Sequence, residues 1–397
     1  MKFDFTTIYD RRGRDAMAVD AVEKIPVFQP NEGFDAIPMW VADMNFATAP
    51  AVTEAIRKRL EHPLFGYFMT SDEYFDSIIR WQQRRNGVTG LEKEHIGYEN
   101  GVLGGLMSAL AAVCARGDHV LVHSPTYIGF TRSIENGGYH VITSPLKPDR
   151  YGVQRMDFFD METKIKRNDI RAVVFCSPHN PTGRVWEQEE LEHFMDMARR
   201  LNVTVISDEI WSDLTLRGHQ HIPLQSVSDD ARQRTVALYA PSKTFNLAGL
   251  IGSYHIVYNE ALHKRMESSL SHYNSMNVLS MHALIGAYSD EGNQWVDELR
   301  EVLTENVKYA CKFIRKNLPG VSVQQPEGTY MLFLDCEEYC RRSGRTLDEV
   351  KKAGYEVGVV WQDGRPFHGA HHIRMNLALP MEKVVIAMDR LKEHVFI

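Results

Sequence analysis

Four short runs of aliphatic and β-branched residues, separated by longer helical stretches, constrain the fold of this 397-residue chain more than any other feature. Each run is apolar toward both sides, as is typical of parallel strands that helices cover on both faces of a sheet. Their predicted ends lie near His123, Cys176, Ser207 and Tyr239. Residues 187–201 predict an amphipathic helix whose apolar side is formed by Leu191, Phe194, Met195 and Ala198. The middle of the chain is therefore expected to be α/β, with a mostly parallel sheet flanked by helices.

The two ends of the chain have different patterns. Residues 294–318 predict one long helix, which is followed by three strand-like runs and a closing helix from residue 382. We therefore expect a smaller α+β domain over residues 291–397, after a large domain over residues 46–290. Residues 1–45 show little periodicity, and we expect this segment to pack with the small domain.

A chemically distinctive side chain follows each of the four predicted strands. Tyr127 follows the first, Asn180 the second, Asp208 the third and Lys243 the fourth. Ligands of open α/β sheets bind outside the carboxyl ends of the strands, so these four side chains are expected to converge. Upstream, the glycines of YENGVLGGLMSALAAVC stand at the start of an apolar helix, whose free N–H groups and dipole favour a phosphate.

Pyridoxal 5′-phosphate is the cofactor whose chemistry needs these five features. A lysine forms a Schiff base with its aldehyde, an aspartate keeps its ring nitrogen protonated, and an asparagine can donate to its phenolic oxygen. An aromatic side chain stacks on the ring, and a helix N-terminus accepts the phosphate. A dinucleotide site fits less well, because no G-x-G-x-x-G follows a predicted strand.

Composition and charge exclude several classes of protein. The formal net charge of −7 gives no chain-wide footprint for nucleic acid, and no apolar run approaches the roughly 18 residues that span a membrane. The first residues mix acidic and basic side chains without an apolar stretch, so we expect no secretory signal. Five scattered cysteines favour a reducing cytoplasm over a disulfide framework, and we expect no metal site.

Several stretches of the chain resemble a known family. SPHNPTGRVW, SDEIWSD, APSKTFNLAGL and HIRMNLALP resemble the fold-type I pyridoxal-phosphate enzymes of the class I/II aminotransferase superfamily. FDFTTIYDRRG, IPMWVADMNFATAP and FGYF are similar to the branch of cystathionine β-lyases and cysteine C–S lyases. The resemblance covers nearly the whole chain.

The resemblance implies a catalytic set of three residues. Lys243 carries the cofactor as a Schiff base, Asp208 pairs with the pyridine nitrogen, and Tyr127 stacks on the ring. Asn180 is implied to contact the phenolic oxygen.

The resemblance also implies how the phosphate is held. Val102 and Leu103 bind it through backbone amides. Ala240 stands where the family usually has a serine, so Ser242 is expected to supply the missing hydrogen bond. Tyr67 is implied to reach the phosphate in the neighbouring subunit, which predicts a homodimer with active sites at the subunit interface.

At the substrate end, the implied contacts depart in part from the family. Arg374 binds the α-carboxylate as a bidentate fork, and Ala42 lies in the loop expected over the substrate. Trp361 and Gln362 stand where the lyase branch often has Pro-Gly, and we expect Trp361 to contact the substrate. Trp211 replaces the tyrosine or histidine that usually follows the aspartate by three positions, which puts the local tuning of the ring in doubt.

These features favour a carbon–sulfur β-lyase acting on small amino acids. Such an enzyme cleaves L-cystathionine, L-cysteine or cysteine S-conjugates to a thiol, pyruvate and ammonia by α,β-elimination. An aminotransferase of an L-amino acid is the alternative, because both reactions use the same residues around the cofactor. A pyridoxal-phosphate-binding regulatory protein is a remote alternative.

Overall fold

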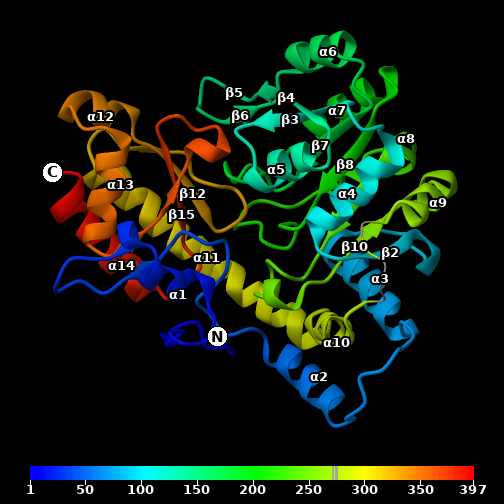
Figure 1. Cartoon of the computed structure of the whole chain (residues 1–397), viewed down its shortest axis with the longest axis horizontal. Coiled ribbons are helices and arrows are strands. Elements are labelled where there is room, and N and C mark those ends of the chain that lie inside the picture. Colours follow the sequence, from blue (N-terminus) through cyan, green and yellow to red (C-terminus); the bar gives the residue numbers. More distant parts are fainter. Residues whose placement is uncertain (271, 273–275) are drawn as a thin grey trace.

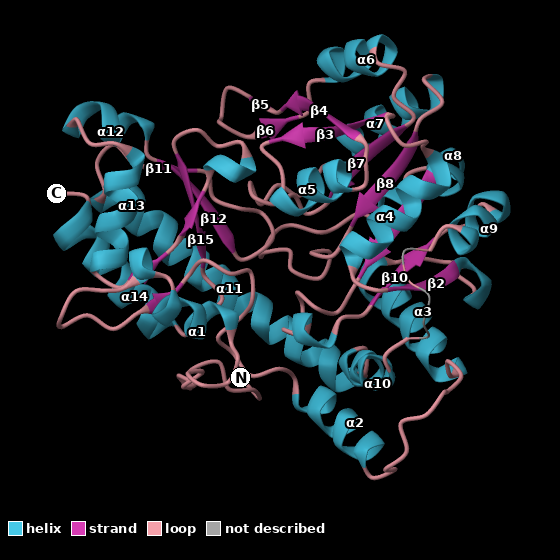
Figure 2. Cartoon of the chain, viewed as in Figure 1, coloured by secondary structure: helices cyan, strands magenta, loops and turns pink. Residues whose placement is uncertain are grey.

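A twisted sheet forms the centre of the larger part of the molecule, and its described strands all run parallel except one, which is second from an edge (Figures 1 and 2). The computed structural model describes residues 1–270, 272 and 276–397. Over these residues the sheet has seven strands, in the order β2 (Ile96–Glu99), β10 (Ser253–Ile256), β9 (Thr235–Tyr239), β8 (Thr204–Asp208), β7 (Ala172–Cys176), β3 (His119–Ser124) and β4 (His140–Pro145). The four predicted strands are β3, β7, β8 and β9, which lie side by side and run parallel.

Helices cover both faces of this sheet, as the two-sided apolar runs predict. One face packs against α4 (Val102–Val113), α5 (Ile128–Asn136) and α9 (Glu260–Ser268). The other packs against α6 (Phe158–Arg167), α7 (Gln188–Arg200) and α8 (Asp229–Arg234). Within β7, Val174 and Cys176 face the first layer, whereas Val173 and Phe175 face the second. The predicted α/β architecture is therefore confirmed.

The helix predicted over residues 187–201 is α7, and its four predicted apolar residues are all buried. It begins at a capping box, in which the side chains of Glu187 and Glu190 each accept from the other's backbone. The long helix α11 runs from Asp290 to Asn317 and starts earlier than predicted, because the Ser289 side chain caps it by accepting from the Gly292 N–H.

A second, antiparallel sheet lies beside α11 (Figure 1). Its strands are β11 (Ser322–Val323), β12 (Met331–Asp335), β15 (His372–Asn376) and β14 (Gln362–Asp363), in that order. The helices around it are α12 (Glu337–Ser343), α13 (Leu347–Glu356) and α14 (Met381–Arg390), with a final π-helical turn over Leu391–Val395.

The first part of the chain joins this second sheet region. After α1 (Met17–Lys24), strand β1 (Ile37–Pro38) pairs in parallel with β13 (Val359–Val360). Asp35 accepts from Lys383 at 2.9 Å and also pairs with Arg390 of α14. The domain boundaries at residues 45 and 290 stay predictions.

The remaining elements complete the larger part. Helices α2 (Pro50–Leu60), α3 (Asp72–Asn86) and α10 (Val278–Ala287) pack together, and β5 (Lys147–Pro148) pairs with β6 (Gln154–Arg155). Within the described ranges, no helix has the length and apolarity needed to cross a membrane.

Candidate active site

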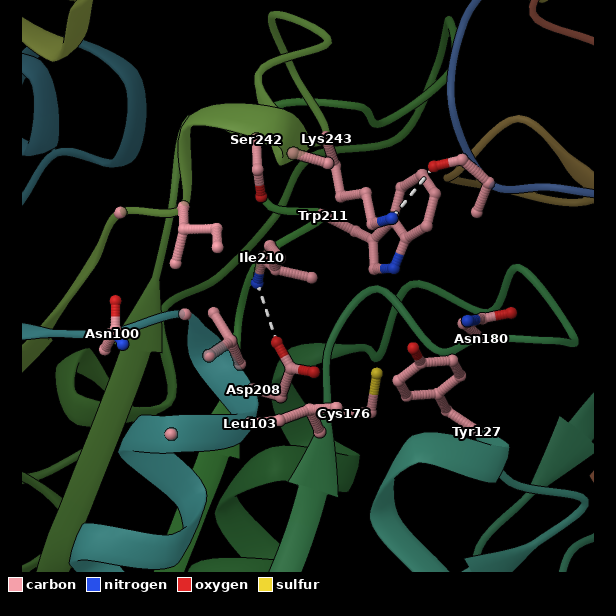
Figure 3. Close-up of a pocket in the computed structure, with 17 residues that line it drawn as sticks. Asn100, Leu103, Tyr127, Cys176, Asn180, Asp208, Ile210, Trp211, Ser242 and Lys243 are labelled. Carbon is pink, nitrogen blue, oxygen red and sulfur yellow. Dashed lines mark hydrogen bonds between the residues drawn. The ribbon is translucent and has the colours of Figure 1, made fainter. Parts of the chain in front are cut away.

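A cavity of about 240 Å³ lies at the carboxyl ends of β7, β8 and β9 (Figure 3). The side chains of Tyr127, Asn180, Asp208 and Lys243 line it together, as their positions after four parallel strands predict. Four further predicted site residues also line it: Ala42, Val102, Leu103 and Ser242. Tyr67, Arg374 and Trp361 are not among its lining residues.

Asp208 is the last residue of β8 and is buried at the floor of the cavity. One of its carboxylate oxygens accepts from the Ile210 N–H at 3.0 Å, and Figure 3 shows the other facing the open space. Burial raises the pKa of Asp208 to about 7, although the Ile210 N–H and the nearby Lys243 favour its charged form. The site therefore holds a carboxylate that lacks a full cationic partner.

Lys243 reaches into the cavity from the turn after β9. Its Nζ donates to the Ala42 carbonyl oxygen at 2.8 Å and lies 5.6 Å from the centre of the Trp211 ring. Burial, together with the positive charge of Arg374, lowers the pKa of Lys243 to about 8. The amine is therefore closer to its neutral, nucleophilic form than a surface lysine is.

One end of the cavity has the features of a phosphate site. Helix α4 starts here, after Gly101 in a left-handed conformation with φ of 83°, so that the first N–H groups of the helix face the cavity. The Ser242 hydroxyl points into the same space (Figure 3), whereas Ala240 does not line it. Among the described lining residues, Lys243 is the only basic side chain.

The sequence reasoning missed six residues that line the cavity: Asn100, Cys176, Ile210, Ala248, Ile251 and Gly252. Cys176 is paired with Asp208 across β7 and β8, and Ile210 lies two positions after Asp208. Ile251, near the start of α4, has φ of 46°, which is strained for a β-branched residue. The spacing after Asp208 could have indicated Ile210, but no sequence signal indicates a strained isoleucine.

Arg374 is buried in the middle of β15, next to the cavity. Its Nη1 donates to Asn180 Oδ1 at 3.2 Å, and its Nη2 donates to Gln362 Oε1 and, at 3.4 Å, to the Trp40 carbonyl oxygen. Its Nε is buried without a partner among the described residues. Burial lowers the pKa of Arg374 to about 10. The ring of Phe367 covers the guanidinium, and its centre lies 4.3 Å from Arg374 Cζ.

The loop around Ala42 connects these groups. The Ala42 carbonyl oxygen accepts from both Lys243 and, at 3.0 Å, the Tyr330 hydroxyl. Its neighbour Asp43 forms an ion pair with Arg11 at 2.5 Å, so that the N-terminal segment lies against this loop.

Trp361 does not reach the cavity, unlike our expectation. Its side chain is fully buried in the core of the second sheet region, where Nε1 donates to the Lys351 carbonyl oxygen at 3.2 Å. The large apolar indole is sequestered in this core, and the next residue, Gln362, faces Arg374 instead. Tyr67 is fully exposed and lies in the segment between α2 and α3, which runs along the outside of the molecule (Figure 1).

The chain is similar to known proteins over nearly its whole length. The family model for aminotransferase class I and II matches residues 36–391. Cystathionine beta-lyase PatB from Bacillus subtilis is 35% identical over 363 residues, covering 90% of this chain and 92% of that protein. Protein MalY from Escherichia coli is 30% identical, covering 96% of each chain. The crystal structure of the PLP-bound C-S lyase from Staphylococcus hominis has a TM-score of 0.89 at 32% identity, over 98% of both chains.

Proposed function

We propose that this chain, which belongs to the class I and II aminotransferase family, is a pyridoxal 5′-phosphate-dependent carbon–sulfur β-lyase. The observation that carries the proposal is the cavity in which a buried carboxylate and a buried amine face one space, beside a buried arginine. The similarity to PatB and to the C-S lyase of S. hominis favours a lyase within this family.

The residues of the cavity fit the cofactor. Asp208 has a carboxylate oxygen facing the cavity and a raised pKa, so a cationic ring nitrogen would supply the missing opposite charge. The α4 N-terminus and Ser242 offer donors for a phosphate at a place without a basic side chain of its own. Lys243 is placed to bind the aldehyde, and Tyr127 and Ile210 to contact the ring.

When bound, pyridoxal phosphate supplies an aldehyde that condenses with an amine and a ring that accepts electrons from the substrate Cα. The protein then has to bind the substrate carboxylate, move the α-proton and exclude water. Arg374 is our candidate for the carboxylate, because it is a buried cation whose hydrogen-bond acceptors in the described part of the chain are all neutral. The buried Asn180 amide lies beside it and would orient both the substrate and the cofactor.

We assign proton transfer to Lys243. Its lowered pKa of about 8 leaves about a tenth of the amine neutral at pH 7, far more than a surface lysine has, and its amine lies at the same cavity as Asp208. Loss of the α-proton and of the β-thiolate from a cysteine conjugate leaves a three-carbon enamine. Water converts this enamine to pyruvate and ammonia, and the thiolate takes up a proton, so that no oxidant or reductant is needed.

We further propose that the working enzyme is a homodimer. The segment around Tyr67 exposes four large apolar side chains, Leu64, Phe65, Tyr67 and Met69. A second copy of the chain would cover them and receive Tyr67 near its cofactor phosphate. A cytoplasmic location is part of the same proposal and is supported by five cysteines that are all free thiols.

The proposal is tested with purified protein, pyridoxal phosphate and either L-cystathionine or L-cysteine, without any keto acid. We expect equal amounts of pyruvate, ammonia and released thiol over many turnovers. Conversion of an amino acid only when a keto acid is added would instead identify an aminotransferase. Binding of the cofactor without either reaction would favour a regulatory protein.

A further inference from the structure

Gln362 and Arg374 lie directly opposite each other on neighbouring antiparallel strands. Residue 362 of β14 pairs in register with residue 374 of β15, and Arg374 Nη2 donates to Gln362 Oε1. Both side chains therefore lie on the same face of the sheet, the one that turns toward Asn180.

Every hydrogen-bond acceptor that Arg374 contacts among the described residues is neutral. They are the amide oxygens of Asn180 and Gln362 and the carbonyl oxygen of Trp40. No described acidic side chain lies within 4.0 Å of its guanidinium, and its Nε is buried without a partner. Binding of an anion to such a buried cation is favourable, because an unpaired charge in the interior costs free energy that an anion would offset.

The residue next to Gln362 is acidic, and the sheet turns it to the other side. Asp363 accepts from Lys351 and from Arg365, each at 2.6 Å, and these two cations neutralise it. Since side chains alternate along a strand, a shift of one position would bring a carboxylate to Arg374. The buried Trp361 indole holds this register from the preceding position.

We propose that Gln362 is a positioning residue, which holds the Arg374 guanidinium with a neutral acceptor and so keeps its charge available for the substrate carboxylate. This inference rests on the proposed function, in which Arg374 binds the α-carboxylate. An acidic side chain at residue 362 would hold the guanidinium equally well and would occupy it with the wrong anion. Residue 362 therefore sets the affinity for amino acids.

The decisive comparison is between Gln362→Glu and Gln362→Met. Glutamate keeps the shape and the acceptor but adds a charge, whereas methionine keeps the length and removes the acceptor. Gln233→Glu, at an exposed position of α8, is the control for an added charge elsewhere, and Arg374→Gln defines complete loss of the site.

The measurement is calorimetric binding of 3-(methylthio)propionate to the cofactor-loaded protein. This probe has the carboxylate and thioether of a cysteine conjugate but no amine, so it undergoes no reaction. We expect Gln362→Glu to weaken binding about 10- to 100-fold, the range of one charge-assisted hydrogen bond. Gln362→Met is expected to weaken binding by a smaller factor, about 3- to 10-fold, because it removes one acceptor while Asn180 and the Trp40 carbonyl still hold the guanidinium. Gln233→Glu is expected to bind like the original protein.

Two other results overturn the inference in distinguishable ways. If Arg374→Gln loses binding and Gln362→Glu retains it, Gln362 has no role in keeping the charge free, while the proposed function stands. If Arg374→Gln binds as well as the original protein, Arg374 is not the carboxylate site and this inference falls with that assignment, whereas the proposed lyase activity is decided separately by the release of pyruvate, ammonia and thiol.

Steady-state kinetics give a second readout that a purely structural role would not produce. With the cysteine conjugate as substrate, Gln362→Glu should raise KM by the same factor and leave kcat close to its original value. A fall in kcat with unchanged KM would instead show that residue 362 acts on the reaction step, and would overturn the inference.

Discussion

Replacement of Asp208 by asparagine should stabilise the cofactor-free protein, although it removes a residue assigned to the active site. The physical reason is the burial of the carboxylate, which raises its pKa from 3.8 to about 7. Asparagine keeps the acceptor for the Ile210 N–H, which Asp208 satisfies at 3.0 Å, and carries no charge into the interior.

The expected gain depends on pH in a defined direction. The folded protein binds the Asp208 proton more tightly than the unfolded chain does, so the contribution of this group to stability falls as the pH rises from about 4 to about 7. At about 1.4 kcal/mol per pKa unit, the cost of the charged form reaches about 4 kcal/mol above pH 7. With about 2.1 cal/mol/K of unfolding entropy per residue, this corresponds to about 5 °C in Tm for a chain of this length.

The assay is thermal and urea unfolding of cofactor-free protein at about pH 4.5 and about pH 8.5, on either side of most of the titration. We expect Asp208→Asn to gain stability at the higher pH and little at the lower. Asp169→Asn, at an exposed position with φ of 47° that asparagine tolerates, is the control. An equal gain at both pH values, or none at the higher, would refute the argument that the buried charge is the cause.

Three further predictions concern other groups of the site. In the cofactor-free protein, the rate of acylation of Lys243 should rise with a midpoint near pH 8, because the lowered pKa leaves the amine mostly protonated only below that value. Mass spectrometry of the modified peptide measures this rate, and a midpoint near 10.5 would contradict the prediction. Arg374→Lys should raise KM for amino acids about 10- to 100-fold with a smaller effect on kcat, because one ammonium cannot replace a bidentate guanidinium. Steady-state kinetics measure KM and kcat separately, and an unchanged KM would exclude Arg374 from the carboxylate site. Mixing the inactive Lys243→Ala and Tyr67→Ala variants should restore activity in hybrid dimers, and a failure to do so with hybrids present would contradict a contribution of Tyr67 across the interface.

The strands that build the site were readable from the sequence because they are buried on both faces. Continuous apolar runs gave their ends to within one residue: β7 ends at Cys176 as predicted, and β8 ends at Asp208 where Ser207 was expected. Since parallel strands end at one edge of the sheet, the convergence of Asn180, Asp208 and Lys243 followed from their positions alone.

The residues around Arg374 could not be placed in the same way. β14 is only two residues long, so its alternation leaves no readable period in the sequence. A tryptophan beside a polar glutamine looks like the residue that a substrate would meet, yet burial in the core is the ordinary place for a large apolar ring. Only the pairing of β14 with β15 assigns Gln362, and not Trp361, to the face of Arg374.

One physical property, which the family motifs do not reveal, is common to Asp208, Lys243 and Arg374. Burial shifts the pKa of each toward its neutral form, and among the described residues none of the three has an ion-pair partner within 4.0 Å. Residues selected for stability would be paired, because an isolated buried charge costs several kcal/mol. The missing opposite charges are those that a cationic ring nitrogen and a substrate carboxylate would bring, and an aldehyde would remove the remaining charge by binding the amine. The uncompensated buried charges therefore both destabilise the empty site and favour the binding of oppositely charged groups. The two variants test this in complementary ways: Asp208→Asn removes a buried charge, and Gln362→Glu supplies a competing charge to Arg374.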